Sequence, residues 1–133
     1  MKQINKINNE LIKLHDSYFV AISDNIGEQI TTLSFLTEDK KEIDIYLRSV
    51  YNSRCIDWKF GNIVLDAEVI TDKNRIKELI IFIEDLTDIQ IKDKKYIELM
   101  KKVLNKELFI IEINPSYGAY YLSICKDIKI LSK

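Results

Sequence analysis

The sequence has 133 residues, of which 47% are hydrophobic and 31% are charged, and its formal net charge is −1. A chain of this length is expected to form a single domain, residues 1–133, whose core needs no metal ion or disulfide to be stable. The lack of a basic excess argues against a dedicated nucleic-acid-binding protein. The charge is nevertheless uneven, because residues 57–88 carry eight acidic and four basic side chains and residues 89–133 carry five acidic and nine basic ones.

The first predicted element is an amphipathic helix, because apolar residues recur at spacings of three and four (Ile4, Ile7, Leu11 and Leu14). Three strands are expected to follow, since apolar and polar residues alternate over residues 18–22, 31–35 and 43–47. Their short connections predict an antiparallel meander.

Residues 63–69 are expected to form the next strand, with Ile63, Leu65, Ala67 and Val69 on one buried face. Asp66 and Glu68 then point to solvent. The segment ELIIFIEDL, residues 78–86, is apolar on both faces and predicts a central strand that is covered on both sides.

A second helix is predicted over residues 88–106, with Asp93 as an alternative start and with Ile97 on its buried side. Two last strands, residues 107–113 and 119–131, are predicted to form a hairpin around the turn NPSYG. Without alternating strand–helix–strand units, these elements predict an α+β fold. We expect a curved, meander-like antiparallel sheet of about six to seven strands, packed against one N-terminal helix and one late helix.

Cys55 and Cys125 belong to no CxxC motif or Cys/His cluster, and the chain has a single histidine. We therefore expect free thiols, no metal site and no cofactor. The N-terminal segment MKQINKINNELIK lacks the apolar core of a signal peptide, and no apolar run approaches the roughly 18 residues of a membrane span. These features predict a cytoplasmic protein that binds neither nucleic acid nor membrane.

The segment LHDSYF, residues 14–19, places the three residue types of a hydrolase triad side by side as His15, Asp16 and Ser17. Adjacent residues point in different directions on a strand or a helix, whereas the members of a working triad converge. No glycine lies nearby to build an oxyanion hole. We interpret the segment as the junction between the first helix and the first strand, and we do not expect an enzyme.

Two groups of acidic residues are the strongest candidates for a functional surface: Asp66 with Glu68, and Glu84 with Asp85 and Asp88. Carboxylate pairs serve glycosidases and bind hard cations, although an acidic pair on an amphipathic strand is more often its solvated side. Such residues also suit a partner protein with a basic cleft. We predict a partner-binding surface that contains Glu84, Asp85, Asp88, Asp66 and Glu68.

Three segments together resemble a pattern found in small bacterial proteins. They are LHDSYF after a short helix, IDIYLRSVYNSRCIDWKFGNIVLDAEV with its asparagine-led strand, and LFIIEINPSYGAYYLSICKDIKI with its NPSYGA turn. Some proteins with this pattern accompany polymorphic-toxin systems as immunity proteins. The resemblance covers most of the chain and implies a protein that binds and neutralises one cognate toxin without catalysis.

Two functional hypotheses follow. The first is a non-catalytic protein-binding module, an immunity protein that inhibits a bacterial toxin by stoichiometric binding. The alternative is a small-molecule-binding domain, or an unfamiliar enzyme, with a pocket between sheet and helices near His15, Tyr117 and Tyr121. If the first hypothesis is right, neutralising the acidic residues is expected to weaken partner binding, and replacing His15 is expected to be tolerated. If the alternative is right, replacing His15 is expected to impair ligand binding, and neutralising the acidic residues is expected to be tolerated.

Overall fold

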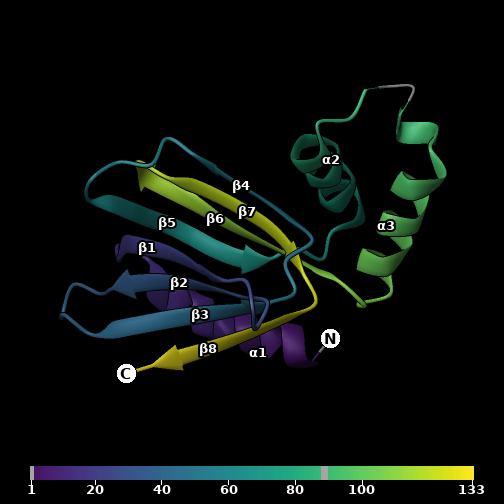
Figure 1. Ribbon diagram of the computed structural model, residues 1–133. Coiled ribbons are helices and arrows are strands. Elements are labelled where there is room, and N and C mark those ends of the chain that lie inside the picture. Colours follow the sequence, from purple (N-terminus) through teal and green to yellow (C-terminus); the bar gives the residue numbers. More distant parts are fainter. Residues whose placement is uncertain (1, 88–89) are drawn as a thin grey trace.

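The computed structural model describes residues 2–87 and 90–133 (Figure 1). This part of the chain has an α+β fold, with an eight-stranded antiparallel sheet and three α-helices. The α-helices are α1 (Lys2–Leu11), α2 (Lys73–Glu84) and α3 (Lys94–Leu104), and the 3₁₀ helices are η1 (Ile12–Leu14) and η2 (Gln90–Lys92). The strands are β1 (Tyr18–Asn25), β2 (Ile30–Leu36), β3 (Glu42–Arg48), β4 (Asn52–Ile56), β5 (Asn62–Val69), β6 (Phe109–Tyr117), β7 (Tyr120–Cys125) and β8 (Asp127–Ser132).

The strand order is β4-β7-β6-β5-β1-β2-β3-β8, which confirms the predicted meander of β1, β2 and β3 and the predicted pairing of β6 with β7. Residues 114–117, predicted to lie in the turn, belong instead to β6 and continue its pairing with β5. Two four-stranded halves meet where β1 pairs with β5 over only two residues, Tyr18 with Ile63 and Phe19 with Asn62. Figure 1 shows the two halves one above the other. The sheet is not strongly curled, in contrast to the curved sheet expected.

The segment expected to form one last strand, residues 119–131, forms two. β7 lies between β4 and β6, whereas β8 pairs with β3 at the opposite edge of the sheet. Lys126 lies between them, and its backbone N–H donates to Arg48 O at 2.9 Å. This division adds one strand to the predicted number. β4, which was not predicted, adds another, and the sheet has eight strands although residues 78–86 do not form the strand expected there.

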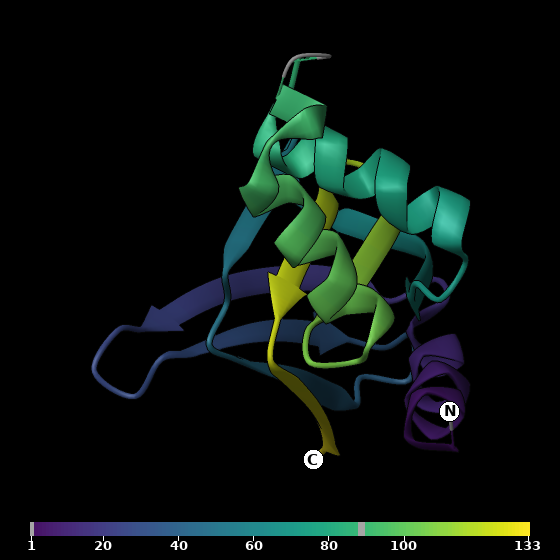
Figure 2. The same cartoon turned by 90° about the vertical axis from the view of Figure 1, so that its right-hand side faces the viewer.

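Two apolar clusters hold the layers together. One is formed by α1 and both halves of the sheet, and it contains the fully buried Phe19 and Tyr121. The other lies between the outer face of β6 and β7 and the helices α2 and α3, where Ile110, Leu122 and Ile124 are fully buried. Figure 2 shows α2 and α3 together on one side of the strands, with α1 near the lower half.

The prediction of a central strand over residues 78–86 is wrong, because these residues belong mostly to α2. Asp72 begins the helix, since its side chain accepts a hydrogen bond from the backbone of Arg75 at 2.9 Å. The buried side of α2 repeats at helical spacing and contains Ile76, Leu79, Ile80 and Ile83. The strand prediction began two residues too late to include the start of this pattern.

The late helix is shorter than predicted. η2 precedes it, and α3 begins after Asp93, whose side chain accepts from Lys95 N at 3.2 Å. The alternative start is therefore confirmed. The prediction for the buried side was wrong by one position, because Tyr96 is buried and Ile97 is 44% exposed.

The register of β5 shifts between Ile63 and Asp66, where it pairs with β6. Ala67 is buried as predicted, and Asp66 and Glu68 are exposed as predicted. Ile63 and Leu65, expected in the core, instead lie on the outer side, because the irregularity turns Val64 inward. Apolar and acidic side chains therefore share the outer face of β5.

Cys55 and Cys125 are both free thiols, the first exposed and the second buried, as expected. In residues 2–87 and 90–133, none of the helices has the length and apolar character needed to cross a membrane.

Candidate functional site

The acidic residues of the predicted partner site lie in two separate places. Asp66 and Glu68 are exposed on β5. Glu84 is the last residue of α2 and Asp85 follows it, so they end a helix and not a central strand. Asp88 lies outside the described residues. The structure therefore brings Asp66 near Glu68, and Glu84 next to Asp85.

The length of α2 separates these two pairs. The first turn of α2 contacts Glu112, the cross-strand neighbour of Glu68, through Arg75. Glu84 ends the same helix, about 14 Å further along its axis at the usual rise per residue. The two acidic pairs thus belong to different parts of the surface.

Glu84 and Asp85 have local structural roles at the end of α2. Asp85 takes the left-handed backbone conformation with φ of 54°, and its N–H donates to Phe82 O at 3.3 Å. Glu84 is half-buried, and its Oε1 is buried with no hydrogen-bond partner among the described residues. Of these two residues, Asp85 is the one that is exposed to a partner.

An open surface on the outer side of the sheet surrounds Asp66 and Glu68. Tyr18, Ile63 and Tyr117 are paired across β1, β5 and β6, so their side chains lie in one row on this surface. Tyr18 is 44% exposed and Tyr117 is 51% exposed. We call this surface the acidic–aromatic face, and it consists of Tyr18, Ile63, Leu65, Asp66, Glu68, Asn114 and Tyr117.

A buried carboxylate fixes α2 beside the acidic–aromatic face. Glu112 is 2% exposed, and its Oε2 accepts hydrogen bonds from Arg75 Nη2 at 2.7 Å and from the Tyr120 hydroxyl at 2.6 Å. Asn114 Nδ2 donates to Asp66 Oδ1 at 2.8 Å and so links β6 to β5 at the surface. A buried charge needs such partners, and here they come from a helix and a neighbouring strand.

Sequence reasoning missed Arg75, Glu112 and Tyr120. The sequence did contain a signal for a buried, paired charge, because Glu112 is the one charged residue in the apolar segment LFIIEI. A charge in a buried strand predicts a cation or a hydroxyl donor opposite it. Which residues supply these groups depends on where α2 packs, and a single sequence does not show that.

Electrostatic repulsion acts within the acidic–aromatic face. Partial desolvation raises the pKa of the Glu68 carboxyl above its usual value, the negative charges of Asp66 and Glu112 add to this effect, and the nearby Arg75 opposes it. Burial and the hydrogen bond to Glu112 also raise the pKa of the Tyr120 hydroxyl, so it remains a donor at neutral pH. A cation brought to this face by a partner is expected to relieve the repulsion.

His15, Asp16 and Ser17 do not converge as a catalytic triad. His15 Nε2 lies 3.4 Å from Asp16 Oδ2 at the surface, and His15 Nδ1 donates to Leu65 O at 2.6 Å. Ser17 is buried, and its Oγ has no hydrogen-bond partner in the described part of the chain. The segment forms the junction between η1 and β1, as interpreted from the sequence. The hydrogen bond to Leu65, and then the charge of Asp16, raise the pKa of His15.

The pocket expected near His15, Tyr117 and Tyr121 is not formed by these residues. His15 borders a groove of about 570 Å³ that is lined mainly by charged and polar side chains around the β2–β3 connection. Tyr121 is 2% exposed in the core, and Tyr117 belongs to the acidic–aromatic face. The three side chains therefore lie in three different environments.

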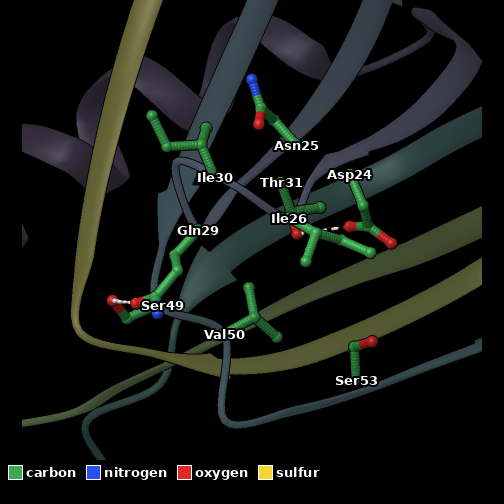
Figure 3. Close-up of a pocket in the computed structure, with 9 residues that line it drawn as sticks. All are labelled: Asp24, Asn25, Ile26, Gln29, Ile30, Thr31, Ser49, Val50 and Ser53. Carbon is green, nitrogen blue, oxygen red and sulfur yellow. Dashed lines mark hydrogen bonds between the residues drawn. The ribbon is translucent and has the colours of Figure 1, made fainter.

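A further groove of about 480 Å³ lies between the tip of the β1–β2 hairpin and the segment that connects β3 to β4 (Figure 3). Four of its polar side chains are bonded in two pairs. The Thr31 hydroxyl donates to Asp24 at 2.6 Å, and the Ser49 hydroxyl donates to Gln29 at 3.2 Å. The first bond braces the hairpin itself, and the second, together with the Ser49 N–H that donates to Gln29 O at 2.8 Å, ties the hairpin to the next connection, so we interpret the groove as a structural joint.

Asn62 joins the three segments on which the resemblance rests. Its side chain is 1% exposed, its Oδ1 accepts from Ala119 N at 2.9 Å, and its Nδ2 donates to Phe19 O at 3.2 Å. Beside it, Val64 N–H donates to Ser17 O at 2.9 Å. The LHDSYF segment, the asparagine-led strand and the NPSYGA turn therefore meet at one place in the fold, where they hold β1, β5 and the β6–β7 turn together.

Comparison with protein-family models gives no match, and comparison with curated proteins also gives none. Within residues 2–87 and 90–133, no group of three or more His, Cys, Asp or Glu side chains is arranged to hold a metal ion. The family resemblance therefore stays a prediction, and the acidic–aromatic face is the candidate functional site.

Proposed function

We propose that this chain is a non-catalytic protein-binding module that neutralises a cognate bacterial toxin by stoichiometric binding. The acidic–aromatic face supports the proposal, because carboxylates and aromatic rings are exposed together on one open side of the sheet. The resemblance to immunity proteins supplies the class of partner.

The aromatic residues of this face suit the centre of a protein interface. Tyr18 and Tyr117 present rings that bury a large area at a small cost in side-chain entropy, and each keeps a hydroxyl for hydrogen bonding. Leu65 adds an aliphatic side chain that is 45% exposed. Such exposed apolar groups, rimmed by polar ones, are typical of interaction surfaces.

The carboxylates define the chemistry of the partner. Asp66 and Glu68 repel each other, and the charge of Glu112 adds to the repulsion on Glu68 while Arg75 partly offsets it, so a cationic partner surface lowers the energy of the two exposed carboxylates. Toxins that cleave nucleic acids need a basic, phosphate-binding cleft. An inhibitor that covers such a cleft associates fast, and its association weakens with salt.

The experiment is to purify the tagged chain from its native host at low and high salt and to test each captured protein for toxicity. The proposal requires one stoichiometric partner that stops growth when expressed alone and does not when co-expressed with this chain. The double variant Asp66→Asn/Glu68→Gln is expected to bind that partner at least about tenfold more weakly, chiefly through slower association. Tyr18→Ala/Tyr117→Ala is expected to raise the dissociation rate.

Glu28→Gln/Glu38→Gln is the matched control, because it removes the same charge from exposed loops outside the face. Glu84→Gln/Asp85→Asn tests the second acidic pair, and a smaller effect is expected from it. If a toxic partner is bound but the Asp66→Asn/Glu68→Gln and Tyr18→Ala/Tyr117→Ala variants both retain wild-type affinity, this face is not the binding site. If the captured partners are not toxic, the immunity role is wrong.

A further inference from the structure

Three lysines from distant parts of the chain line one groove. Lys95 and Lys102 lie on α3, and Lys126 lies between β7 and β8. The groove has a volume of about 360 Å³, within the size range of small-ligand sites. In Figure 2, α3 (green) lies in front of the passage from β7 to β8 (yellow). Among residues 2–87 and 90–133, no carboxylate forms an ion pair with any of the three.

The groove also has an apolar floor and an aromatic wall. Leu99 and Leu108 are buried beneath it, with 6% and 7% of their surface exposed. Tyr51 lines one side and is 57% exposed. An exposed aromatic ring beside ammonium groups provides a stacking surface next to an anion site.

Backbone hydrogen bonds fix the walls relative to each other. Tyr51 N–H donates to Ile124 O at 2.7 Å and holds the β3–β4 connection against β7. Leu108 N–H donates to Lys102 O at 3.2 Å, which joins the end of α3 to the start of β6. The lysines and the ring are therefore presented by a preformed surface, which lowers the entropy cost of binding.

The charge of the groove is positive. Among the described residues Glu98 is the one acidic side chain that lines it, and its carboxylate is paired with Lys94 at 4.0 Å. Three lysines and one carboxylate therefore line the groove, and the carboxylate already has another partner. Lysine acts as a flexible point charge and suits a phosphate group better than it suits planar recognition of a carboxylate.

We propose that this groove binds a small phosphate monoester that carries a planar ring, of the nucleoside monophosphate class. The phosphate contacts Lys102 and Lys126, and the ring lies against Tyr51 above Leu99. This site is separate from the acidic–aromatic face and does not depend on the proposed toxin binding.

The test is a titration of isotope-labelled protein with adenosine 5′-monophosphate, followed by NMR amide shifts. Saturable shifts are expected at Tyr51, Leu99, Lys102 and Lys126, and adenosine and ribose 5-phosphate are each expected to bind at least about tenfold more weakly. This difference corresponds to about 1.4 kcal/mol. Binding of the monophosphate is expected to weaken at higher salt.

Lys102→Gln/Lys126→Gln is expected to lower the affinity for adenosine 5′-monophosphate at least about tenfold, and Tyr51→Ala about fivefold. Lys129→Gln, an exposed lysine on β8, is the control and is expected to change nothing. Shifts that do not saturate, or that Lys129→Gln reduces equally, overturn the proposal. So does binding of a ten-nucleotide single-stranded RNA without binding of the monophosphate, because it points to an extended nucleic-acid surface.

Discussion

The side chain of Asn62 lies against Gly118 so closely that a Cβ atom at residue 118 would overlap Asn62 Oδ1. Gly118 has φ of +84°, and the Asn62 oxygen accepts hydrogen bonds from Lys59 N at 2.7 Å and Ala119 N at 2.9 Å. The start of β5 and the β6–β7 turn are therefore fitted to each other. The asparagine and the glycine of the two sequence motifs serve one structural purpose.

Gly118→Ala is expected to lower the free energy of unfolding by about 3 kcal/mol, through positive φ and through overlap with Asn62. Gly61→Ala is the matched control. Gly61 has φ of +79° but nothing within 4 Å of a Cβ, so a loss of only about 1 kcal/mol is expected. Urea unfolding measures both. Equal losses in the two variants would mean that the Asn62 contact adds nothing.

Coupling between the two residues gives a second check. Asn62→Ala alone leaves two N–H groups and a carbonyl unpaired and is expected to cost about 3 kcal/mol. Because it also removes the overlap, the double variant with Gly118→Ala is expected to lose less than the sum of the single losses. If the loss in the double variant equals the sum of the single losses, the proposed overlap between residues 62 and 118 is wrong.

Arg75→Met is expected to destabilise the protein by about 3 kcal/mol, because it leaves the buried Glu112 without its cation. Arg75→Met/Glu112→Leu is expected to recover most of this loss, since it removes the buried charge as well. Arg75→Lys keeps the charge and serves as the control. Chemical unfolding of all three variants tests the prediction, and a double variant less stable than Arg75→Met contradicts it.

The single histidine offers a direct measurement of pH dependence. His15 is expected to titrate with a pKa above its ordinary value of 6.5, because its protonated form is favoured by Leu65 O and by Asp16. Its contribution to stability is therefore present below the ordinary pKa and is lost as the pH rises through the raised one. NMR titration of the imidazole measures the pKa, and Asp16→Asn is expected to lower it. An unchanged pKa in that variant removes Asp16 as a cause.

Glu68 is expected to show the opposite pH dependence to a salt-bridged carboxylate. Its raised pKa means that the folded state resists ionisation, so stability falls as the pH rises from the ordinary to the raised pKa. Glu68→Gln is expected to stabilise the protein at pH 7 by up to about 0.5 kcal/mol, a small value because the residue is exposed. Below both pKa values the two proteins are expected to be equally stable. Thermal unfolding at pH 3.5 and pH 7 makes the comparison.

The fold was predictable where one face of an element meets the core and the other meets water. Leu33 and Phe35 in β2, and Ile43 and Ile45 in β3, are buried as their alternation predicts. α2 was mistaken for a strand because residues 78–83 are nearly all apolar, and short apolar runs carry no clear period. Its helical spacing becomes visible only when the run is extended back to Ile76.

The site was predictable only in part, because its composition depends on register and on packing across the chain. The exposure of Asp66 and Glu68 could be predicted from the alternation in β5. The exposure of Leu65 could not, because it results from a local shift in pairing that no residue in the sequence indicates. Glu112 was visible as a charge in an apolar strand. Its partner Arg75 lies 37 positions away, on the helix that was mistaken for a strand.

The passage from β7 through Lys126 to β8 has a consequence for how this protein folds. β7 pairs with β6 and β8 pairs with β3, so one continuous stretch of chain pairs with strands on opposite sides of the sheet. Both pairings require the same late segment, and β3, the partner of β8, lies far earlier in the sequence. Such distant pairing requires costly loop closure and makes folding slow, on the order of milliseconds to seconds. Until it is complete, β3 and β6 each expose an unpaired edge, and at those edges nascent chains are expected to aggregate.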